Sequence, residues 1–256
     1  MKRVSVSLVL ATAISVSLAF AARPVAAAGA SPQVGGFSRI VIPVMANAPG
    51  MFNSLFRTKV AILNATQLNY TIQVILYGGA GQVNIASIPM APGQLRNYEN
   101  FLADVFSFTG AGTVIFDANG LGRDFLVTAE VFNDLGAGRY KTVVAPGPIL
   151  ENSLPEFDSY SLGITVDGKT RTNIGFFNDS PDSQTVTADV FDASGTKVTS
   201  IPTTLPGKSW AQVGIGTNVS NGFIRWKVQA SAYCYAVVVD NLSQDGTFIP
   251  AADYIP

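Results

Sequence analysis

The sequence predicts an all-β fold in which two antiparallel β-sandwiches follow each other along the chain. Three observations predict it: the chain repeats itself once, the repeated segments alternate apolar and polar residues, and Gly- and Pro-containing turn signals separate them. Alternation with a period of two is typical of strands that bury one face, and short strands with regular turns are typical of sandwiches. We expect modules at residues 37–146 and 157–256, joined by a Pro-containing linker at 147–156.

The first 28 residues predict a secretory signal peptide or an uncleaved membrane anchor. They begin with Met1-Lys2-Arg3, continue with an apolar stretch from Val4 to Ala22, and end in small residues through Ala28. A basic start, an apolar middle and an Ala-x-Ala ending are typical of a signal peptide. An apolar stretch of roughly 19 residues is also nearly long enough to span a bilayer. In both cases we expect the remaining chain to be exported, to the periplasm or the cell exterior.

The body of the chain contains one internal repeat. The segment Arg57–Asn64 aligns with Arg171–Asn178 at a shift of 114 residues, and the alignment continues at shifts of 110 and later 107. Each change in the shift falls where a loop is expected, and the order of the matched positions is kept. Such a repeat is the signature of a duplicated structural unit, so the two halves should share one fold.

An arginine and an asparagine mark the same places in both copies. Arg57 and Arg171 stand where equivalent strands begin, and Asn64 and Asn178 stand where those strands end. Asparagine readily adopts turn conformations, and arginine can pair with a carboxylate or a carbonyl at a sheet edge. Because they recur, we expect these four residues to maintain the module; a role in an interface is the alternative.

One segment of the first copy departs from the strand pattern. Apolar residues between Tyr98 and Phe106 recur at i, i+3, i+4, i+7 and i+8, with Asn97 before them and Gly110 after them. This spacing predicts a short amphipathic helix with Asn97 as its N-cap. The second copy is shorter here by about one helical turn, so we expect its helix to be shortened or lost.

The composition argues against catalysis. The chain has no histidine, one cysteine and only 13% charged residues, with a net charge of −1. The commonest general base and metal ligand is therefore missing, as are disulfides and cysteine-rich metal sites. We expect no enzyme activity and no cofactor. Nucleic acid is not an expected partner either, because phosphate binding needs clustered Lys and Arg.

Several local motifs have simpler structural interpretations. Gly207-Lys208-Ser209 ends like a phosphate-binding loop but lacks the required upstream glycine, and a turn explains it better. Asp240–Gly246 faintly suggests a calcium loop, although a polar hairpin is the preferred interpretation and a weak surface calcium site stays open. Cys234 falls in an inward-facing row and should pack as a small hydrophobe. A hydrolase that uses carboxylates alone would have to draw on the acids nearest to strands, which are Asp117, Asp124, Glu130 and Asp189.

Aromatic residues provide the main binding signal. Five of them are predicted to lie off the inward rows, where they would form an interaction surface: Tyr70, Tyr77, Phe191, Tyr233 and Tyr235. Outward aromatics on a sandwich can stack on sugars or anchor a protein interface. Packing between the modules or under loops is the alternative.

A family resemblance adds to this interpretation. It rests on Ile42-Pro43 followed by Ala48-Pro49-Gly50, on the two repeated Arg-Thr…Asn stretches, on two Pro-Gly turns, and on Val238–Asn241 leading into Phe248–Pro250. From about residue 37 to 255 the chain resembles exported bacterial proteins built of tandem immunoglobulin-like β-sandwich modules. The resemblance implies export and a sandwich fold, and it implies no catalytic residues.

Together these observations predict a non-catalytic, exported interaction or structural protein. We expect it to be an accessory or scaffold subunit that docks on a partner protein or a membrane-associated envelope assembly. A glycan-binding or adhesion module that uses the outward aromatics is the alternative. Contact with the membrane itself is expected only through the N-terminal segment, if that segment is retained.

Overall fold

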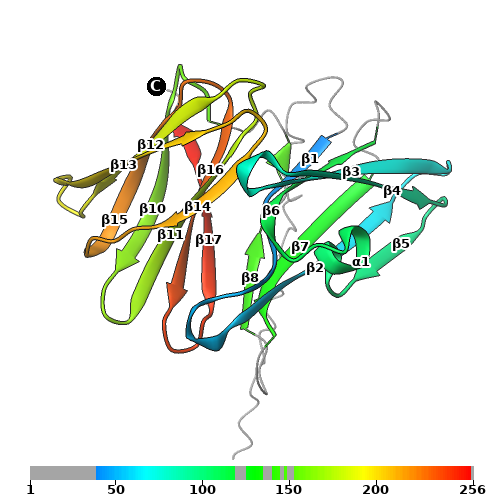
Figure 1. The fold of residues 1–256 in the computed structure, drawn as a ribbon, viewed down its shortest axis with the longest axis horizontal. Helices are drawn as coiled ribbons and strands as arrows, with labels where there is room; N and C mark the ends of the chain where they lie inside the picture. The colour runs from blue at the N-terminus through cyan, green and yellow to red at the C-terminus, as the bar shows by residue number, and fades with distance from the viewer. Residues whose placement is uncertain (1–38, 119–124, 135–139, 145–146, 149–152, 255–256) are drawn as a thin grey trace, which may run out of the picture. The chain divides into compact units, whose positions relative to one another are not determined.

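The computed structural model describes residues 39–118, 125–134, 140–144, 147–148 and 153–254. These residues belong to one compact unit and form an all-β fold with one α-helix and antiparallel strand pairs (Figure 1). The predicted all-β class is confirmed. The predicted leader at residues 1–28 lies outside the described residues. Within the described part of the chain, no helix is long and apolar enough to cross a membrane.

The first half comprises strands β1–β9 and the helix α1. One hydrogen-bonded path runs through its strands in the order β4-β3-β6-β1-β2-β7-β8, with β5 attached to β2 and β9 to β1. The path links two layers because β1 pairs with β6 along most of its length and with β2 at its last two residues. The bounds are β1 Arg39–Pro49, β2 Leu55–Asn64, β3 Tyr70–Gly78, β4 Val83–Met90, β5 Leu95–Tyr98, α1 Phe101–Phe106, β6 Gly110–Asp117, β7 Phe125–Asn133, β8 Tyr140–Val144 and β9 Gly147–Pro148.

The second half comprises strands β10–β18 in two separate sheets. One has the order β13-β12-β15-β10-β18 and the other the order β14-β11-β16-β17. The bounds are β10 Asp158–Val166, β11 Thr170–Asn178, β12 Gln184–Phe191, β13 Lys197–Leu205, β14 Trp210–Gly214, β15 Val219–Lys227, β16 Ala232–Asp240, β17 Gly246–Pro250 and β18 Ala252–Tyr254.

The two halves repeat one strand order. The layer β4-β3-β6-β1 corresponds to β13-β12-β15-β10, and the layer β5-β2-β7-β8 corresponds to β14-β11-β16-β17. In a constant-type immunoglobulin sandwich the first strand shares a sheet with the second, fourth and fifth. Here the first strand of each half shares its layer with the third, fourth and sixth strands. The halves therefore resemble immunoglobulin domains in their antiparallel layers and differ from them in strand order.

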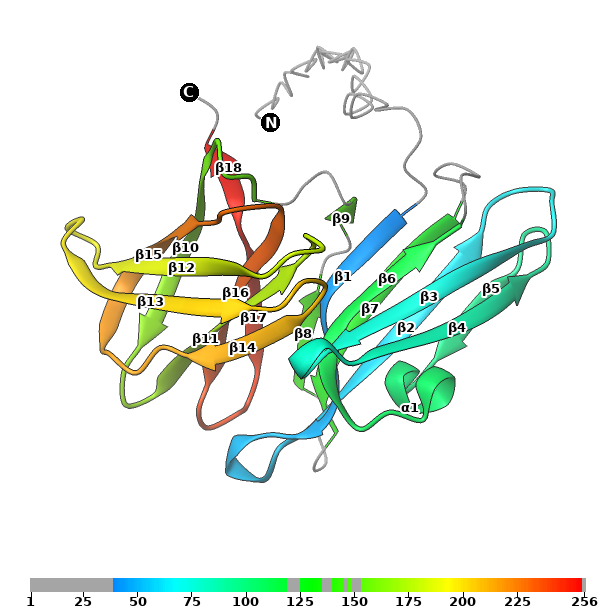
Figure 2. The same ribbon diagram turned by 45° about the horizontal axis from the view of Figure 1, so that its top comes forward.

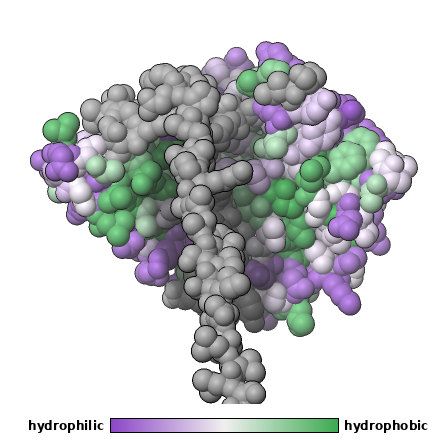
Figure 3. Space-filling view, turned by 180° about the vertical axis from the view of Figure 1, so that it is seen from behind, coloured by the Kyte–Doolittle hydropathy of each residue, from purple (hydrophilic) through white to green (hydrophobic). Residues whose placement is uncertain are grey.

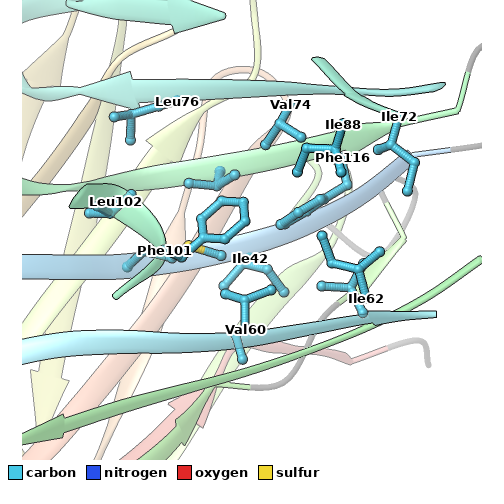
Figure 4. Packing of buried hydrophobic residues seen from close by; sticks show 14 of the residues in the cluster. Ile42, Val60, Ile62, Ile72, Val74, Leu76, Ile88, Phe101, Leu102 and Phe116 are labelled. Atoms are coloured by element: carbon cyan, nitrogen blue, oxygen red, sulfur yellow. The ribbon is translucent and has the colours of Figure 1, made fainter. Parts of the chain in front are cut away.

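Each half has its own apolar core, filled by alternate residues of its strands. In the first half Val60, Ile62 and Val74 are fully buried, while their neighbours in sequence point away from the core. Figure 4 shows Val74 and Phe116 turned toward Val60 and Ile62 of the opposite layer. Fully burying an aliphatic side chain of this size stabilises the fold by about 1.5–3 kcal/mol. The core of the second half is built in the same way around Trp226.

The predicted helix is present, but it begins later than predicted. It runs from Phe101 to Phe106 and buries Phe101 against the first core. Asn97 is not its N-cap: it lies in β5 and pairs with Ala61 of β2. Tyr98 fits the helical spacing of the apolar residues that follow it, but it pairs with Val60 and therefore belongs to the strand β5. In the second half, residues 215–218 between β14 and β15 contain no helix, as the shorter repeat predicted.

The first boundary of the predicted linker differs from the structure. Gly147 and Pro148, the first two residues of the predicted segment 147–156, form β9 and pair with β1. The chain thus contributes one more short strand to the first half before it continues toward β10. The position of β9 beside β1 matches that of β18 beside β10 in the second half.

Candidate functional site

The repeated asparagines hold equivalent turns in the two halves. Asn64 is fully buried, and its Nδ2 donates hydrogen bonds to the carbonyls of Leu68 and Ala91, both at 2.8 Å. Its Oδ1 accepts from the backbone N–H of Thr66 at 2.9 Å. A side-chain amide that satisfies several buried backbone groups fixes the path of the chain after the strand.

Asn178 repeats this arrangement. Its Nδ2 donates to the carbonyls of Asp182 at 2.8 Å and Pro206 at 2.9 Å, and its Oδ1 accepts from the backbone N–H of Ser180 at 3.0 Å. It also accepts a hydrogen bond from Gln184 Nε2 at 2.7 Å. Asn178 is fully buried, like its counterpart. Both asparagines therefore serve the architecture of the repeat.

The repeated arginines have different partners. Arg57 Nη1 forms an ion pair with Asp134 Oδ2 at 2.8 Å. Arg171 instead donates to two amide oxygens, Asn241 Oδ1 at 2.9 Å and Gln244 Oε1 at 2.8 Å. Asp134 and Asn241 are equivalent at the shift of 107, so an amide replaces the carboxylate in the second copy. Burial lowers the pKa of Arg171 from its usual value.

The five aromatics of the predicted interaction surface do not form one surface. The prediction that they point outward is wrong for Tyr70, Tyr233 and Tyr235, which are buried with at most 8% of the residue surface exposed. Tyr70 packs into the core of the first half. Tyr77 is partly buried, and burial raises its pKa. Phe191 is partly buried and lies in β12, where its ring is stacked on Phe223 of β15 in the same half.

Three of these tyrosines pack where the two halves meet. The Tyr77 ring of the first half lies 5.1 Å from the Phe177 ring of the second, and Phe177 lies 6.5 Å from Tyr233. Val41 and Ile115 complete this apolar cluster. Figure 2 shows β14 of the second half beside β3 and β6 of the first. The alternative interpretation, packing between modules, is the one the structure supports.

Tyr235 is held by a polar contact within the same region. Its hydroxyl accepts a hydrogen bond from Trp210 Nε1 at 3.0 Å and donates to Gln212 Oε1 at 3.2 Å. Its ring lies over Gly175, where a Cβ atom would collide with it. Tyr235 is fully buried, and burial raises its pKa well above the usual value. The strand pattern places Tyr235 on the side of β16 that faces away from the core of its own half. It is buried because the first half packs over that side.

Beside this packed region lies a cavity of about 290 Å³ between the halves. The second half contributes the outer face of the sheet β14-β11-β16-β17, with Val237 and Val239 among the lining residues. The first half contributes small residues of β1, among them Ala46 and Ala48. Where aromatic side chains fill the space between the halves, the contact is closed; where alanines and valines face each other, a cavity remains.

Among the residues whose side chains the structure describes, Arg171 is the only charged one that lines this cavity. Three uncharged amide side chains lie around it, those of Asn173, Gln212 and Gln244. At the rim, Met51 and Phe52 are about 60% exposed in the turn after β1, and the Arg171 guanidinium lies 5.8 Å from the Phe52 ring centre. The cavity is thus apolar with a single cationic corner.

The outer face of the sheet β13-β12-β15-β10-β18 carries a second group of aromatic and charged residues. The Phe191 ring is stacked on Phe223 at 4.8 Å, and the Arg225 guanidinium lies 5.5 Å from the Phe191 ring centre. Leu162, paired with Phe223 in the neighbouring strand, is 66% exposed. Figure 3 shows that hydrophobic residues gather on both halves of the molecule. Phe223 and Arg225 were not singled out from the sequence, although they alternate with the buried Ile224 as outward residues do.

Strand periodicity predicts that Asp189 faces solvent, but the structure buries it under this face. It is only 1% exposed and contacts Lys197 at 2.6 Å, Lys227 at 2.9 Å and Arg225 at 3.5 Å. Ser200 donates to it at 2.6 Å. Although burial alone would raise the pKa of Asp189, these hydrogen bonds and the positive charges together lower it far below the usual range. A carboxylate so strongly held in its charged form cannot act as a general acid.

The remaining motifs have structural roles. Lys208, in the glycine-lysine-serine segment, has a positive φ of 51° in a turn and contacts Asp179 Oδ1 at 2.6 Å. Asp240 Oδ1 accepts the backbone N–H groups of Leu242 and Ser243, which makes the suggested calcium loop a hairpin turn. Burial raises the pKa of Cys234 to about 12. Asp124 lies outside the described residues, and within them no group of three or more His, Cys, Asp or Glu could hold a metal ion.

Comparison with known proteins adds little. No protein-family model matches the chain, and no curated protein matches it. Among solved structures, it is similar to β-glucuronidase 2 of Bacteroides uniformis, in a covalent complex with cyclophellitol-6-carboxylate aziridine and in a calcium-binding mutant. In both, the identity is 13%, the match covers 77% of this chain and 24% of the other, and the TM-score is 0.17. The chain spans about a quarter of those structures, and this likeness carries no argument about function.

Proposed function

We propose that the protein is an exported, non-catalytic structural protein that docks on a protein partner of the cell envelope. Export is inferred from the leader pattern in residues 1–28. The absence of histidine from the whole sequence and the strongly held charge of Asp189 support a role without catalysis. The docking face we propose is the outer face of β13-β12-β15-β10-β18, here called the Phe191 face, made by Phe191, Phe223, Leu162, Arg225, Lys197 and Lys227.

One observation carries this choice of face. Phe191 is equivalent to Tyr77 at the shift of 114, and Tyr77 packs on Phe177 where the two halves meet. The first half therefore uses this layer of the repeat as an interface. Among the described elements, the main contacts of the first half with the second are made to β11, β14, β16 and β17, and not to the equivalent layer β13-β12-β15-β10. Stacked aromatic rings beside arginine are typical of the residues that dominate protein interfaces.

The charges on the Phe191 face indicate the chemistry of the partner. Three cations surround the single buried carboxylate of Asp189. We therefore expect a partner with an apolar centre and an acidic rim, because complementary charges steer association and fix orientation. Binding should weaken as salt is raised, since these cations are partly exposed.

The test is recovery of a partner from native envelopes. We expect the wild-type protein, cross-linked and purified, to recover one stoichiometric protein partner. The double variant Phe191→Ser, Phe223→Ser should recover at least tenfold less. Leu242→Ser is the matched control, because Leu242 is 95% exposed but lies in the β16–β17 turn away from this face. Failure of the wild-type protein to recover a stoichiometric partner, or equal recovery by the double variant, would contradict the proposal.

A glycan-binding role is the second candidate, and the aromatic stack favours it. Tyr160 lies 6.3 Å from Phe223 and extends the row of rings across three strands. Exposed rings can pack on sugar faces, and the Tyr160 hydroxyl on this row donates a hydrogen bond to Asp158 Oδ2 at 3.3 Å. Glycan-array binding that disappears in the Phe191→Ala variant would support this function, and an array without signal would remove it.

A further inference from the structure

The cavity between the halves has the composition of a ligand site. Its volume of about 290 Å³ lies just below the usual range for small-molecule pockets, about 300–1,000 Å³. Such pockets combine apolar walls with a few polar groups that orient the ligand. Here the walls come from residues such as Ala46, Val131 and Val237, and the polar groups are Arg171 and neighbouring amides. An apolar cavity of about 150 Å³ already accommodates a ring the size of benzene.

The repeat shows that the charge of Arg171 is unmatched. In the first half the equivalent arginine, Arg57, is neutralised by Asp134. In the second half Asn241 replaces that carboxylate, and among the described residues Arg171 contacts two amide oxygens and the Phe52 ring. No described acidic residue lines the cavity. A partly buried cation without a counter-charge is unfavourable, so its retention beside a cavity calls for an explanation.

The geometry also holds Arg171 ready for a ligand. Two of its nitrogens are bound by Asn241 and Gln244, which fixes the guanidinium plane. A guanidinium has five N–H donors and stays protonated at neutral pH. Donors therefore remain for a bidentate contact with an anion, the geometry that arginine forms with carboxylates. The adjacent Gln212 and Asn173 can donate further hydrogen bonds from their amides.

We propose that this cavity binds a small amphipathic monoanion, an alkyl carboxylate whose apolar chain lies between the two halves and whose head group pairs with Arg171. One cation matches one negative charge, and the apolar walls match the chain. The site is independent of the Phe191 face, which lies on a different sheet. Such a ligand would bridge the halves and stabilise their contact, since binding to the folded state alone raises its stability.

The experiment measures binding of decanoate and 1-octanol to the full-length exported protein by calorimetry. The wild-type protein should bind decanoate, and the uncharged alcohol should bind at least tenfold more weakly. Arg171→Met removes the charge and leaves a shorter, unbranched apolar side chain, and it should weaken decanoate binding at least tenfold, a loss of about 1.4 kcal/mol. Arg171→Lys should retain part of the affinity because the charge remains.

Two further variants make the test specific to the cavity. Arg57→Met is the matched control, because Arg57 is the repeat equivalent of Arg171 and does not line the cavity; it should bind decanoate like the wild type. Ala48→Leu partly fills the cavity and should abolish binding of both probes. Melting temperatures measured without probe verify that each variant is folded. Absence of decanoate binding in the wild type, undiminished binding in Arg171→Met, or undiminished binding in Ala48→Leu would each overturn the proposal.

Discussion

Asn178, the last residue of β11, provides the sharpest stability test. We expect Asn178→Ala to lower the free energy of unfolding by about 3 kcal/mol. Four hydrogen bonds of 2.7–3.0 Å are lost, each with a net value of about 1 kcal/mol. Part of the loss is regained, because Gln184 Nε2 keeps its bond to the Ser231 carbonyl. The Asp182 carbonyl loses this donor, whereas the Pro206 carbonyl keeps its hydrogen bond from Ser209 Oγ.

Urea unfolding followed by fluorescence measures this loss. Both tryptophans, Trp210 and Trp226, lie in the second half. Trp226 lies in its core, and Trp210 also packs against first-half residues, so the signal reports unfolding of the second half and loss of its contact with the first. Asn178→Asp should cost at least as much at neutral pH, because a carboxylate cannot donate to the carbonyls of Asp182 and Pro206. Asn218→Ala is the control: this exposed loop asparagine makes no hydrogen bond in the structure, and we expect a change within about 0.5 kcal/mol.

The equivalent change in the first half then tests whether the halves unfold together. Asn64 makes a matching set of bonds, so Asn64→Ala should also cost about 3 kcal/mol. If the halves form one cooperative unit, this change shifts the tryptophan transition as much as Asn178→Ala does. A cost below about 1 kcal/mol for either asparagine would refute the assignment of a structural role to the repeated residues.

Three further predictions follow from single side chains. The folded-state pKa of Asp189 lies below its unfolded value, so the stability that its charge provides should be present above about pH 4 and decline as the pH falls further. Urea titrations should show the difference in unfolding free energy between the wild type and Asp189→Asn shrinking in that range. A difference that does not depend on pH would contradict this. Cys234 should resist thiol reagents at pH 8 in the native protein and react fully in urea, since burial raises its pKa to about 12; rapid native labelling would disprove its burial. Tyr235→Phe should lower the unfolding free energy by about 1–2 kcal/mol and shift the fluorescence of Trp210, because the indole N–H loses its acceptor; an unchanged spectrum and stability would show that this contact contributes nothing.

Much of the fold follows from local patterns in the sequence. The alternation of Val60 and Ile62 with partly exposed neighbours locates β2, and the aligned positions Ile174 and Phe176 locate its equivalent β11, although the residues beside Phe176 are buried as well. The repeat adds long-range information, because a shift of 114 residues places β3 on β12 and β4 on β13. The start of α1 could not be placed in this way, since pairing of Tyr98 with Val60 extends the sheet into the helical pattern.

The functional surfaces were less accessible to sequence reasoning. Periodicity distinguishes the core-facing side of a strand from the other side, but it does not reveal whether that other side is covered. Tyr233 and Tyr235 have the pattern of outward residues and are buried because the first half packs over them. The cavity beside Arg171 arises from the same contact, from residues as distant in the chain as Val44 and Gly246. A signal was nevertheless present: the replacement of Asp134 by Asn241 at equivalent positions is visible in the repeat alignment.

The contact of Tyr77 with Phe177 joins two unlike layers of the repeat, so the two halves meet head to tail, in a heterologous contact. Were the halves related by a two-fold axis, each would bury the same surface and the arrangement would be complete. Here the counterpart of Phe177 in the first half is Leu63, and that of Tyr233 is Leu126, which is 57% exposed. The layer that the second half buries in the contact is therefore not buried by it in the first half, and the same holds in reverse for the layer of Tyr77. A third copy of the unit, added by a further gene duplication at either end, would meet a layer of the kind that already forms a contact in this chain.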